Sequence, residues 1–138
     1  MKATATFKPT KWDEKTYDKI SSDQKLTKCS VIFTFDAGGE IEGVAKIEWL
    51  MYYSHSDDKD QHNATASYLG LSRIVCKLNG KDGSFVVEER GTFENGEAKS
   101  EGTILPNSGT GELAGISGTA KSFATPTQMH FEVEYEIA

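Results

Sequence analysis

Apolar and polar side chains alternate along most of this chain with a period of two residues. The clearest case is residues 129–137, Met-His-Phe-Glu-Val-Glu-Tyr-Glu-Ile, where every odd position is apolar and every even position is polar or ionisable. Successive side chains of a β-strand point to opposite faces, so this segment predicts a strand with one buried face and one wet face. Similar runs predict about eight strands, at residues 2–8, 26–35, 40–53, 64–78, 84–94, 97–105, 111–120 and 128–137.

The connections between these runs predict how the strands are arranged. No window of a dozen residues carries an apolar stripe at helical spacing, and several joins are short and rich in Asn and Gly, which favour tight hairpins. Strands joined by hairpins form a meander, and closing the meander removes its exposed edges. We therefore predict an all-β fold, a closed antiparallel barrel of about eight strands forming one domain over residues 1–138. A two-sheet sandwich is the alternative.

Two segments interrupt the alternation. Residues 10–24 place Trp12, Tyr17 and Ile20 among charged side chains, which predicts a short helix or an ordered loop crossing the barrel mouth. Residues 54–62 are polar throughout and predict a solvated loop between the third and fourth strands.

One strand is apolar on both of its faces. Residues 47–53 read Ile-Glu-Trp-Leu-Met-Tyr-Tyr, so the outward side of this strand also needs cover. A partner subunit would supply it, which favours a homo-oligomer and a dimer first. Residues 10–24 folding over that face would serve equally well.

The composition of the chain limits which partners and which location are expected. The net charge of −6 and the pI near 5.1 repel phosphate backbones and anionic lipids, so neither nucleic acid nor a membrane is expected as a partner. The N-terminus lacks a continuous apolar stretch, and Cys29 and Cys76 are too few for a disulfide framework. We expect two reduced thiols and a cytoplasmic location.

The sequence also resembles a bacterial family, the domain-of-unknown-function family 3224, grouped with the allene oxide cyclase-like barrels. The resemblance spans nearly the whole chain, and its most specific stretch is residues 104–119, Ile-Leu-Pro-Asn-Ser-Gly-Thr-Gly-Glu-Leu-Ala-Gly-Ile-Ser-Gly-Thr. Phe7, Trp12, residues 83–87 and residues 134–137 add to it. The resemblance implies an eight-stranded barrel with a central cavity and a tendency to self-associate, and it carries no established activity. Members of the family often have Gln and His where this chain has Glu88-Glu89-Arg90.

The sequence offers little support for a metal site or for catalysis by a nucleophile and base. His55, Asp57, Asp58, Asp60 and His62 are close in sequence as metal ligands would be, but their spacing fits neither an EF-hand nor a zincin, so a solvated acidic loop is expected and no metal site. With only three histidines, which the pattern places on polar segments, no nucleophile–base pair can be proposed, and no cofactor is expected.

A carboxylate is the candidate catalytic group. Glu89 shares a strand face with Phe85, Val87, Gly91 and Phe93, so if that face points inward, desolvation raises its pKa and makes it a usable proton-transfer group. An ion pair or a position at the barrel mouth would explain Glu89 without catalysis.

Three aromatic residues are the candidate ligand-binding set. Trp49, Tyr68 and Tyr135 could line a cavity and stack on a flat ligand, or they could be plain core.

These predictions leave three hypotheses for the function. The leading hypothesis is a module that binds a small apolar or aromatic molecule inside the barrel, since eight-stranded interiors are either filled by side chains or hold one small ligand. The second is an enzyme of cyclase or isomerase type using Glu89. The third is a structural or interaction protein with a filled barrel.

Overall fold

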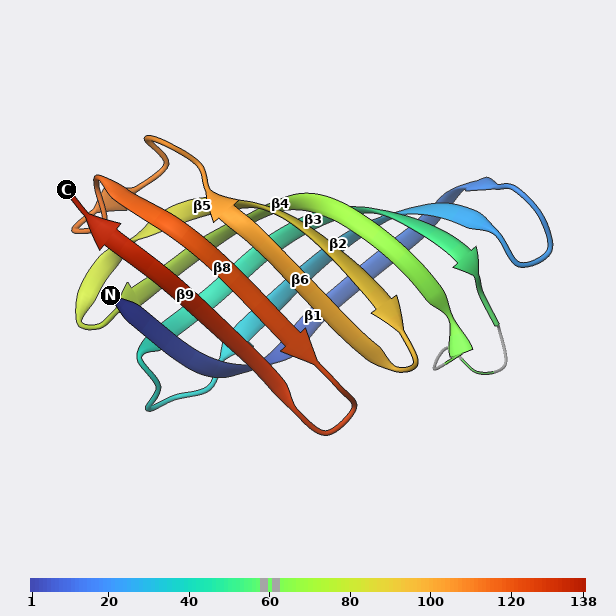
Figure 1. The fold of residues 1–138 in the computed structure, drawn as a ribbon, viewed down its shortest axis with the longest axis horizontal. Coiled ribbons are helices and arrows are strands. Elements are labelled where there is room, and N and C mark those ends of the chain that lie inside the picture. The colour runs from blue at the N-terminus through green and yellow to red at the C-terminus, as the bar shows by residue number, and fades with distance from the viewer. Residues whose placement is uncertain (58–59, 61–62) are drawn as a thin grey trace.

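The protein consists almost entirely of strands in the computed structural model, which describes residues 1–57, 60 and 63–138 (Figure 1). No α-helix occurs among these residues, and the prediction of an all-β fold is confirmed. The strands are β1 (Lys2–Lys19), β2 (Lys25–Phe35), β3 (Ile41–His55), β4 (Thr65–Leu78), β5 (Lys81–Glu94), β6 (Glu97–Ile104), β7 (Thr110–Gly111), β8 (Ile116–Ala124) and β9 (Met129–Ile137).

All strands belong to one antiparallel sheet that closes on itself. The order is β4-β3-β2-β1-β9-β8-β6-β5-β7, and a further pairing of β4 with β5 completes a ring of eight strands. The two-residue strand β7 adds to β5 beside the ring. Apart from β7 and the pairing of β1 with β9 that closes the ring, neighbouring strands are also neighbours in sequence, so the predicted meander is confirmed. The alternative of two stacked sheets is not what forms.

Tight turns fix the register of two hairpins. Asn79 and Gly80 join β4 to β5 with φ of 47° and 86°, and Asn95 and Gly96 join β5 to β6 with φ of 54° and 76°. Positive φ at both central residues is the requirement of a type I′ turn, whose twist matches that of the strands. The Asn-Gly pairs therefore place the following strands, including the one that carries Glu89.

The inward face of the ring forms the hydrophobic core. In β9, Val133 and Tyr135 are buried while Glu134 and Glu136 between and beyond them are exposed, as the alternation predicts. Cys29 and Cys76 are both buried and free. The largest fully buried side chains include Ile41, Ile74, Leu78, Phe85 and Val133 from several strands and Leu113 from the turn between β7 and β8.

The prediction for residues 10–24 was wrong. This segment is neither a helix nor a loop over the mouth, because β1 continues as a strand to Lys19 and pairs with β2 from Phe7 to Lys19. Register shifts at Pro9/Lys11 and Thr16/Asp18 interrupt its two-residue rhythm, which hid the strand in the sequence. Residues 111–120 also differ from prediction, since β7 ends at Gly111 and β8 begins at Ile116.

The length of β1 makes the two ends of the ring unequal. β9 pairs with β1 only from Lys2 to Thr6, and no other described strand pairs with the rest of that edge of β1. Charged side chains, Pro9 and the bulges keep such an edge from recruiting another strand. At this end the β1–β2 hairpin and the end of β3 project beyond the ring (Figure 1). The opening that results is where the cavity lies.

Candidate functional site: an aromatic cavity at one end of the strand ring

A cavity of about 400 Å³ opens at the end of the ring where β1 has its free edge. We call it the mouth cavity. Its volume lies within the range of small-molecule sites. Its walls are largely aromatic or aliphatic, with few charged groups. The residues that line it include Phe7, Pro9, Trp12, Glu14, Lys25, Phe33, Trp49, Met51, Tyr53, Asp57, Ala64, Tyr68, Phe93, Ala98, Ala124, Pro126 and Met129.

Ring contacts organise the cavity wall around Trp49. The Trp49 ring centroid lies 4.7 Å from that of Tyr68, 5.9 Å from that of Phe33 and 6.0 Å from that of Trp12. The contacts with Phe33 and Trp12 are edge-to-face, an arrangement that aligns the positive edge of one ring with the negative face of the other. These four residues come from β1, β2, β3 and β4, so the sheet itself sets their spacing.

A glycine makes room for Tyr68 inside the ring. Tyr68 on β4 is paired with Gly91 on β5, and a Cβ at Gly91 would lie 2.2 Å from Cζ of the Tyr68 ring. No side chain fits there, so the phenol ring packs on bare backbone. Trp49 is likewise paired with a glycine, Gly70 of β4.

Glu89 lies on the face of β5 that it shares with Phe85 and Val87, and this face points inward, which the sequence had left open. Its Oε1 accepts a hydrogen bond of 3.2 Å from the indole Nε1–H of Trp49. Burial raises the pKa of Glu89 to about 7, against the opposing effect of hydrogen bonds from Trp49 and Ser100. With this pKa the carboxyl of Glu89 can both take up and release a proton near neutral pH. Glu89 is not itself part of the mouth cavity lining and sits beyond Trp49 and Tyr68.

A second inward carboxylate, Glu14, was missed at the sequence level. Its Oε2 accepts hydrogen bonds from the hydroxyls of Tyr53 (2.6 Å) and Thr27 (2.7 Å), and its Oε1 accepts one of 3.2 Å from the indole N–H of Trp12. The signal was available, because Trp12 and Glu14 are two residues apart and so share a strand face. It was lost because this segment was not recognised as a strand.

Tyr53 and Lys25 stand at the rim beside Glu14. Burial and the hydrogen bond to Glu14 raise the pKa of Tyr53 far above its usual range, so the phenol stays neutral. The Lys25 ammonium lies 4.9 Å from the centroid of the Tyr53 ring, in a cation–π contact.

The structure separates Tyr135 from the other predicted ligand-binding residues. Trp49 and Tyr68 touch each other and line the mouth cavity, whereas Tyr135 does not line it. The Tyr135 ring is buried, and its hydroxyl accepts a hydrogen bond of 2.7 Å from Nδ2 of Asn79, in the β4–β5 turn. Tyr135 is part of the core that anchors that turn.

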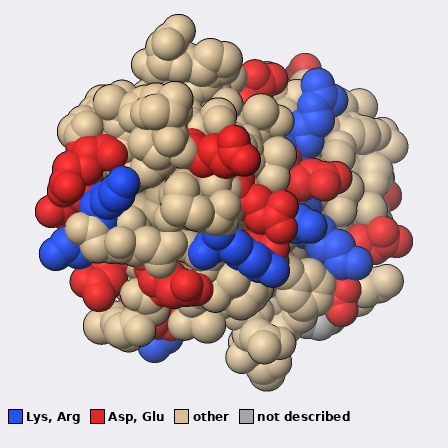
Figure 2. Space-filling model, turned by 60° about the vertical axis from the view of Figure 1, so that its left-hand side comes forward, with Lys and Arg blue, Asp and Glu red and all other residues tan. Residues whose placement is uncertain are grey.

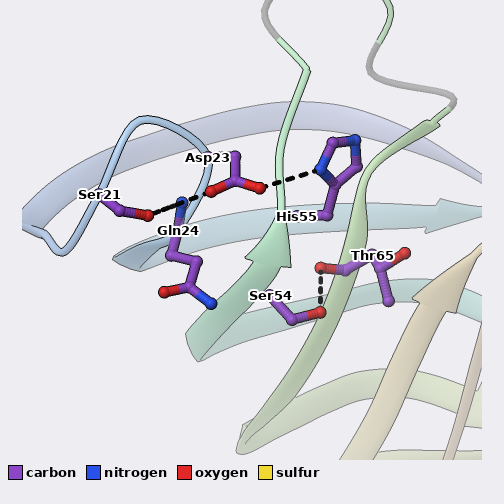
Figure 3. Close-up of polar contacts among 6 residues, drawn as sticks. All are labelled: Ser21, Asp23, Gln24, Ser54, His55 and Thr65. Carbon is purple, nitrogen blue, oxygen red and sulfur yellow. Dashed lines mark hydrogen bonds and ion pairs between the residues drawn. The ribbon is translucent and has the colours of Figure 1, made fainter.

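A polar contact fixes the rim of the cavity. Nδ1 of His55, at the end of β3, lies 3.3 Å from Oδ2 of Asp23 in the β1–β2 turn, and Ser21 donates to the other oxygen of the same carboxylate (Figure 3). The backbone N–H of Ser56 donates to the carbonyl of Asp23 at 2.8 Å. These contacts hold the β1–β2 hairpin against the end of β3. Of the predicted polar loop, Asp58, Lys59, Gln61 and His62 lie outside the described residues.

No group of three or more His, Cys, Asp or Glu side chains among the described residues is placed to hold a metal ion. The candidate cluster named from the sequence includes Asp58 and His62, which lie outside that description.

An apolar patch lies on the outer face of the sheet. Leu50 of β3 and Leu69 and Leu71 of β4 are each about half exposed, and we call them the outer leucine patch. Within the described part of the chain this patch therefore stays about half exposed, and Tyr17 of β1 only borders it beside Leu50 and Leu69. Elsewhere, as Figure 2 shows on one face, side chains of Lys and Arg are interspersed with those of Asp and Glu.

The fold and the mouth cavity define a small all-β protein whose closed strand ring carries an aromatic-lined cavity at one end. The chain belongs to the DUF3224 family, described as proteins of unknown function, whose model matches residues 3–135.

A solved structure of a DUF3224 protein of unknown function from Shewanella oneidensis MR-1 is similar, with a TM-score of 0.72 and 23% sequence identity. The match covers 100% of this chain and 98% of that one, and at this identity it supports the fold alone. No curated protein matches the chain in sequence. Within the described part of the chain, no helix has the length and apolar character needed to span a membrane.

Proposed function

We propose that the strand ring is a barrel of the allene oxide cyclase-like kind and that the protein binds a small apolar or aromatic molecule in the mouth cavity. One observation carries the proposal: an opening of about 400 Å³ whose wall includes Trp49 in ring contact with Trp12, Phe33 and Tyr68. A flat apolar ligand would gain both area burial and stacking there. The two unpaired thiols, Cys29 and Cys76, favour a reducing compartment such as the cytoplasm.

A fluorescent probe tests whether the cavity binds. N-phenyl-1-naphthylamine is neutral, aromatic and of a size suited to the cavity, and its emission rises in apolar surroundings. We expect saturable binding that Ala98→Phe weakens by about tenfold, because Ala98 lines the cavity and the new ring occupies ligand space.

Ala114→Phe is the matched control, since Ala114 is exposed and does not line the cavity. Equal binding by the two variants would place the probe outside the mouth cavity. No binding by the parent protein would favour the alternative of a structural protein with no ligand.

An enzyme of cyclase or isomerase type is the second candidate, favoured by the raised pKa of Glu89 and its inward place next to Trp49. In this mechanism the Glu89 carboxylate removes a proton from one carbon of the substrate and returns it to a different carbon of the same molecule. 2-Tetralone in D₂O is a suitable probe, because a carboxylate that removes its α-protons is sufficient to exchange them for deuterium. We expect faster exchange than in buffer, lost in Glu89→Gln with probe affinity retained. Glu88→Gln, on the exposed face of the same strand, is the control.

We also propose that a second copy of the chain covers the outer leucine patch. On the outer face, Leu69 lies beside Arg90, and Leu71 lies in the next row beside Glu88. A twofold axis between these rows brings Leu69 onto Leu71 of the second copy and Arg90 onto Glu88 of the second copy. The same axis therefore matches apolar with apolar and cation with anion.

Sedimentation equilibrium tests this pairing. The parent protein should dimerise at about 100 μM, and Leu69→Lys should be monomeric, because an ammonium would be buried against Leu71. Ile20→Lys replaces another half-exposed apolar residue, away from the patch, and should leave the dimer intact. A monomeric parent, or dimerisation by Leu69→Lys, contradicts the proposal.

A further inference from the structure

We propose that the mouth cavity is an aromatic cage for an organic cation, a quaternary ammonium or protonated amine carried on an apolar body. This inference rests on the proposed binding function and narrows it to one class of ligand. It follows from how the rings of the cavity use their polar atoms and from the charges that stand around them.

Both tryptophans of the chain donate their indole N–H to a carboxylate. Trp12 donates to Oε1 of Glu14 and Trp49 donates to Oε1 of Glu89, each at 3.2 Å. The one hydrogen-bonding group of each indole is therefore engaged, and what each ring offers a ligand is its π face. An anionic acceptor on the N–H also adds electron density to the ring, which strengthens its attraction for a cation.

Tyr53 repeats this arrangement at the rim. Its hydroxyl donates to Oε2 of Glu14 at 2.6 Å, and its ring already holds an ammonium, that of Lys25, 4.9 Å from the centroid. The protein thus places a cation against a carboxylate-bonded ring of this cavity with one of its own side chains. A ligand cation deeper in the cavity would meet the same kind of surface.

Aromatic rings border the cavity from five neighbouring strands. Trp12, Phe33, Trp49 and Tyr68 lie on β1 to β4, and Phe93 lies on β5. Several aromatic rings bordering one space is the arrangement by which proteins recognise quaternary ammonium groups. Binding of a neutral apolar ligand would gain nothing from the carboxylates of Glu14 and Glu89 that accept hydrogen bonds from these indoles.

The charges near the cavity favour a cation over an anion. Among the described lining residues, the carboxylates of Glu14 and Asp57 stand against the single ammonium of Lys25. The net charge of −6 adds a long-range attraction for cations. An anion would have to approach Lys25 while facing Glu14, which lies on the same rim.

Three probes test the preference for charge. Phenyltrimethylammonium and tert-butylbenzene have the same shape and differ in charge, and 4-tert-butylbenzoate adds a carboxylate to the second. Titration of the parent protein, followed by tryptophan fluorescence and by NMR of the protein, should show the cation binding about tenfold more tightly than the neutral isostere. The carboxylate probe should bind most weakly.

Three variants test the parts of the cage. Trp12 is half exposed, so Trp12→Leu keeps apolar contact and the fold while removing a π face. It should lower the affinity for the cation about fivefold and leave that for tert-butylbenzene within about twofold. Glu14→Gln should act in the same direction, and Lys25→Met should strengthen cation binding by removing a like charge.

The outcomes separate this inference from the function on which it rests. Equal or tighter binding of tert-butylbenzene overturns the cation cage while the small-molecule site stands. Preference for 4-tert-butylbenzoate, lost in Lys25→Met, overturns it in favour of an anion site. If none of the three probes binds, the cage is refuted, and the naphthylamine titration decides separately whether the cavity binds anything.

Discussion

The indole N–H of Trp49 donates a hydrogen bond of 3.2 Å to the carboxylate of Glu89, which lies 40 residues later in the chain. The contact joins β3 to β5 across the inside of the ring, with β4 between them in the sheet. It links the aromatic wall of the mouth cavity to an inward carboxyl whose pKa is raised toward neutrality. Several measurable properties follow from this part of the structure.

Replacing Glu89 by Gln should change how stability depends on pH. The pKa is about 7 in the folded protein against 4.5 for a solvated Glu, so the folded state binds more protons between these values. Stability therefore falls as pH rises from about 4.5 to 7, by about 3 kcal/mol at most. Glu89→Gln removes this loss, because the amide oxygen still accepts from Trp49 and carries no charge.

Urea unfolding of the two proteins at pH 5 and pH 8 measures the effect. The variant should gain stability relative to the parent protein on going from pH 5 to pH 8. Glu88→Gln, whose side chain is exposed, serves as the control and should track the parent. A parallel pH response of the parent and Glu89→Gln would show that Glu89 is not desolvated.

Gly91→Ala should destabilise the fold by about 2 kcal/mol, because the added methyl would lie 2.2 Å from the Tyr68 ring. Gly39→Ala is the control, since its Cβ would meet Ala5 at an ordinary 3.4 Å. In a Tyr68→Ala background the cost of Gly91→Ala should shrink, which a double-mutant cycle by urea unfolding detects. Additive costs would mean that the ring does not pack on Gly91.

Asp23→Asn should loosen the rim of the cavity without changing global unfolding. The hydrogen bond with His55 lowers the pKa of Asp23, so the contact is present above the ordinary pKa of an Asp and is lost as pH falls through the lowered value. Hydrogen exchange at the amide of Ser56, which donates to the Asp23 carbonyl, should become faster in the variant. Unchanged protection at Ser56 would show that the side-chain contact does not hold the hairpin.

Tyr135→Phe should cost stability and leave ligand binding intact. The substitution removes the acceptor of the 2.7 Å hydrogen bond from Asn79 and should cost about 1 kcal/mol. Affinity for N-phenyl-1-naphthylamine should stay within about twofold, because Tyr135 does not line the mouth cavity. A tenfold loss of probe affinity would place Tyr135 at the ligand after all.

Sequence pattern alone determined the all-β class, the meander and which residues of β5 share a face. Alternation in β9 and β5 and the Asn79-Gly80 and Asn95-Gly96 turns are local signals, readable because side-chain direction and turn geometry depend on a few neighbouring residues. Glu89 could be named for the same reason, since Phe85 and Val87 mark its face.

Tertiary structure decided what the local signals could not. Whether residues 10–24 form a strand depended on the hydrogen-bonding edge that β2 offers, because the bulges at Pro9/Lys11 and Thr16/Asp18 break the local rhythm. For a related reason, the sequence analysis missed Glu14, which lines the mouth cavity, and included Tyr135, which does not. Which inward residues meet depends on the register between strands and on which end of the ring stays open, and both are set by pairings between segments far apart in the chain.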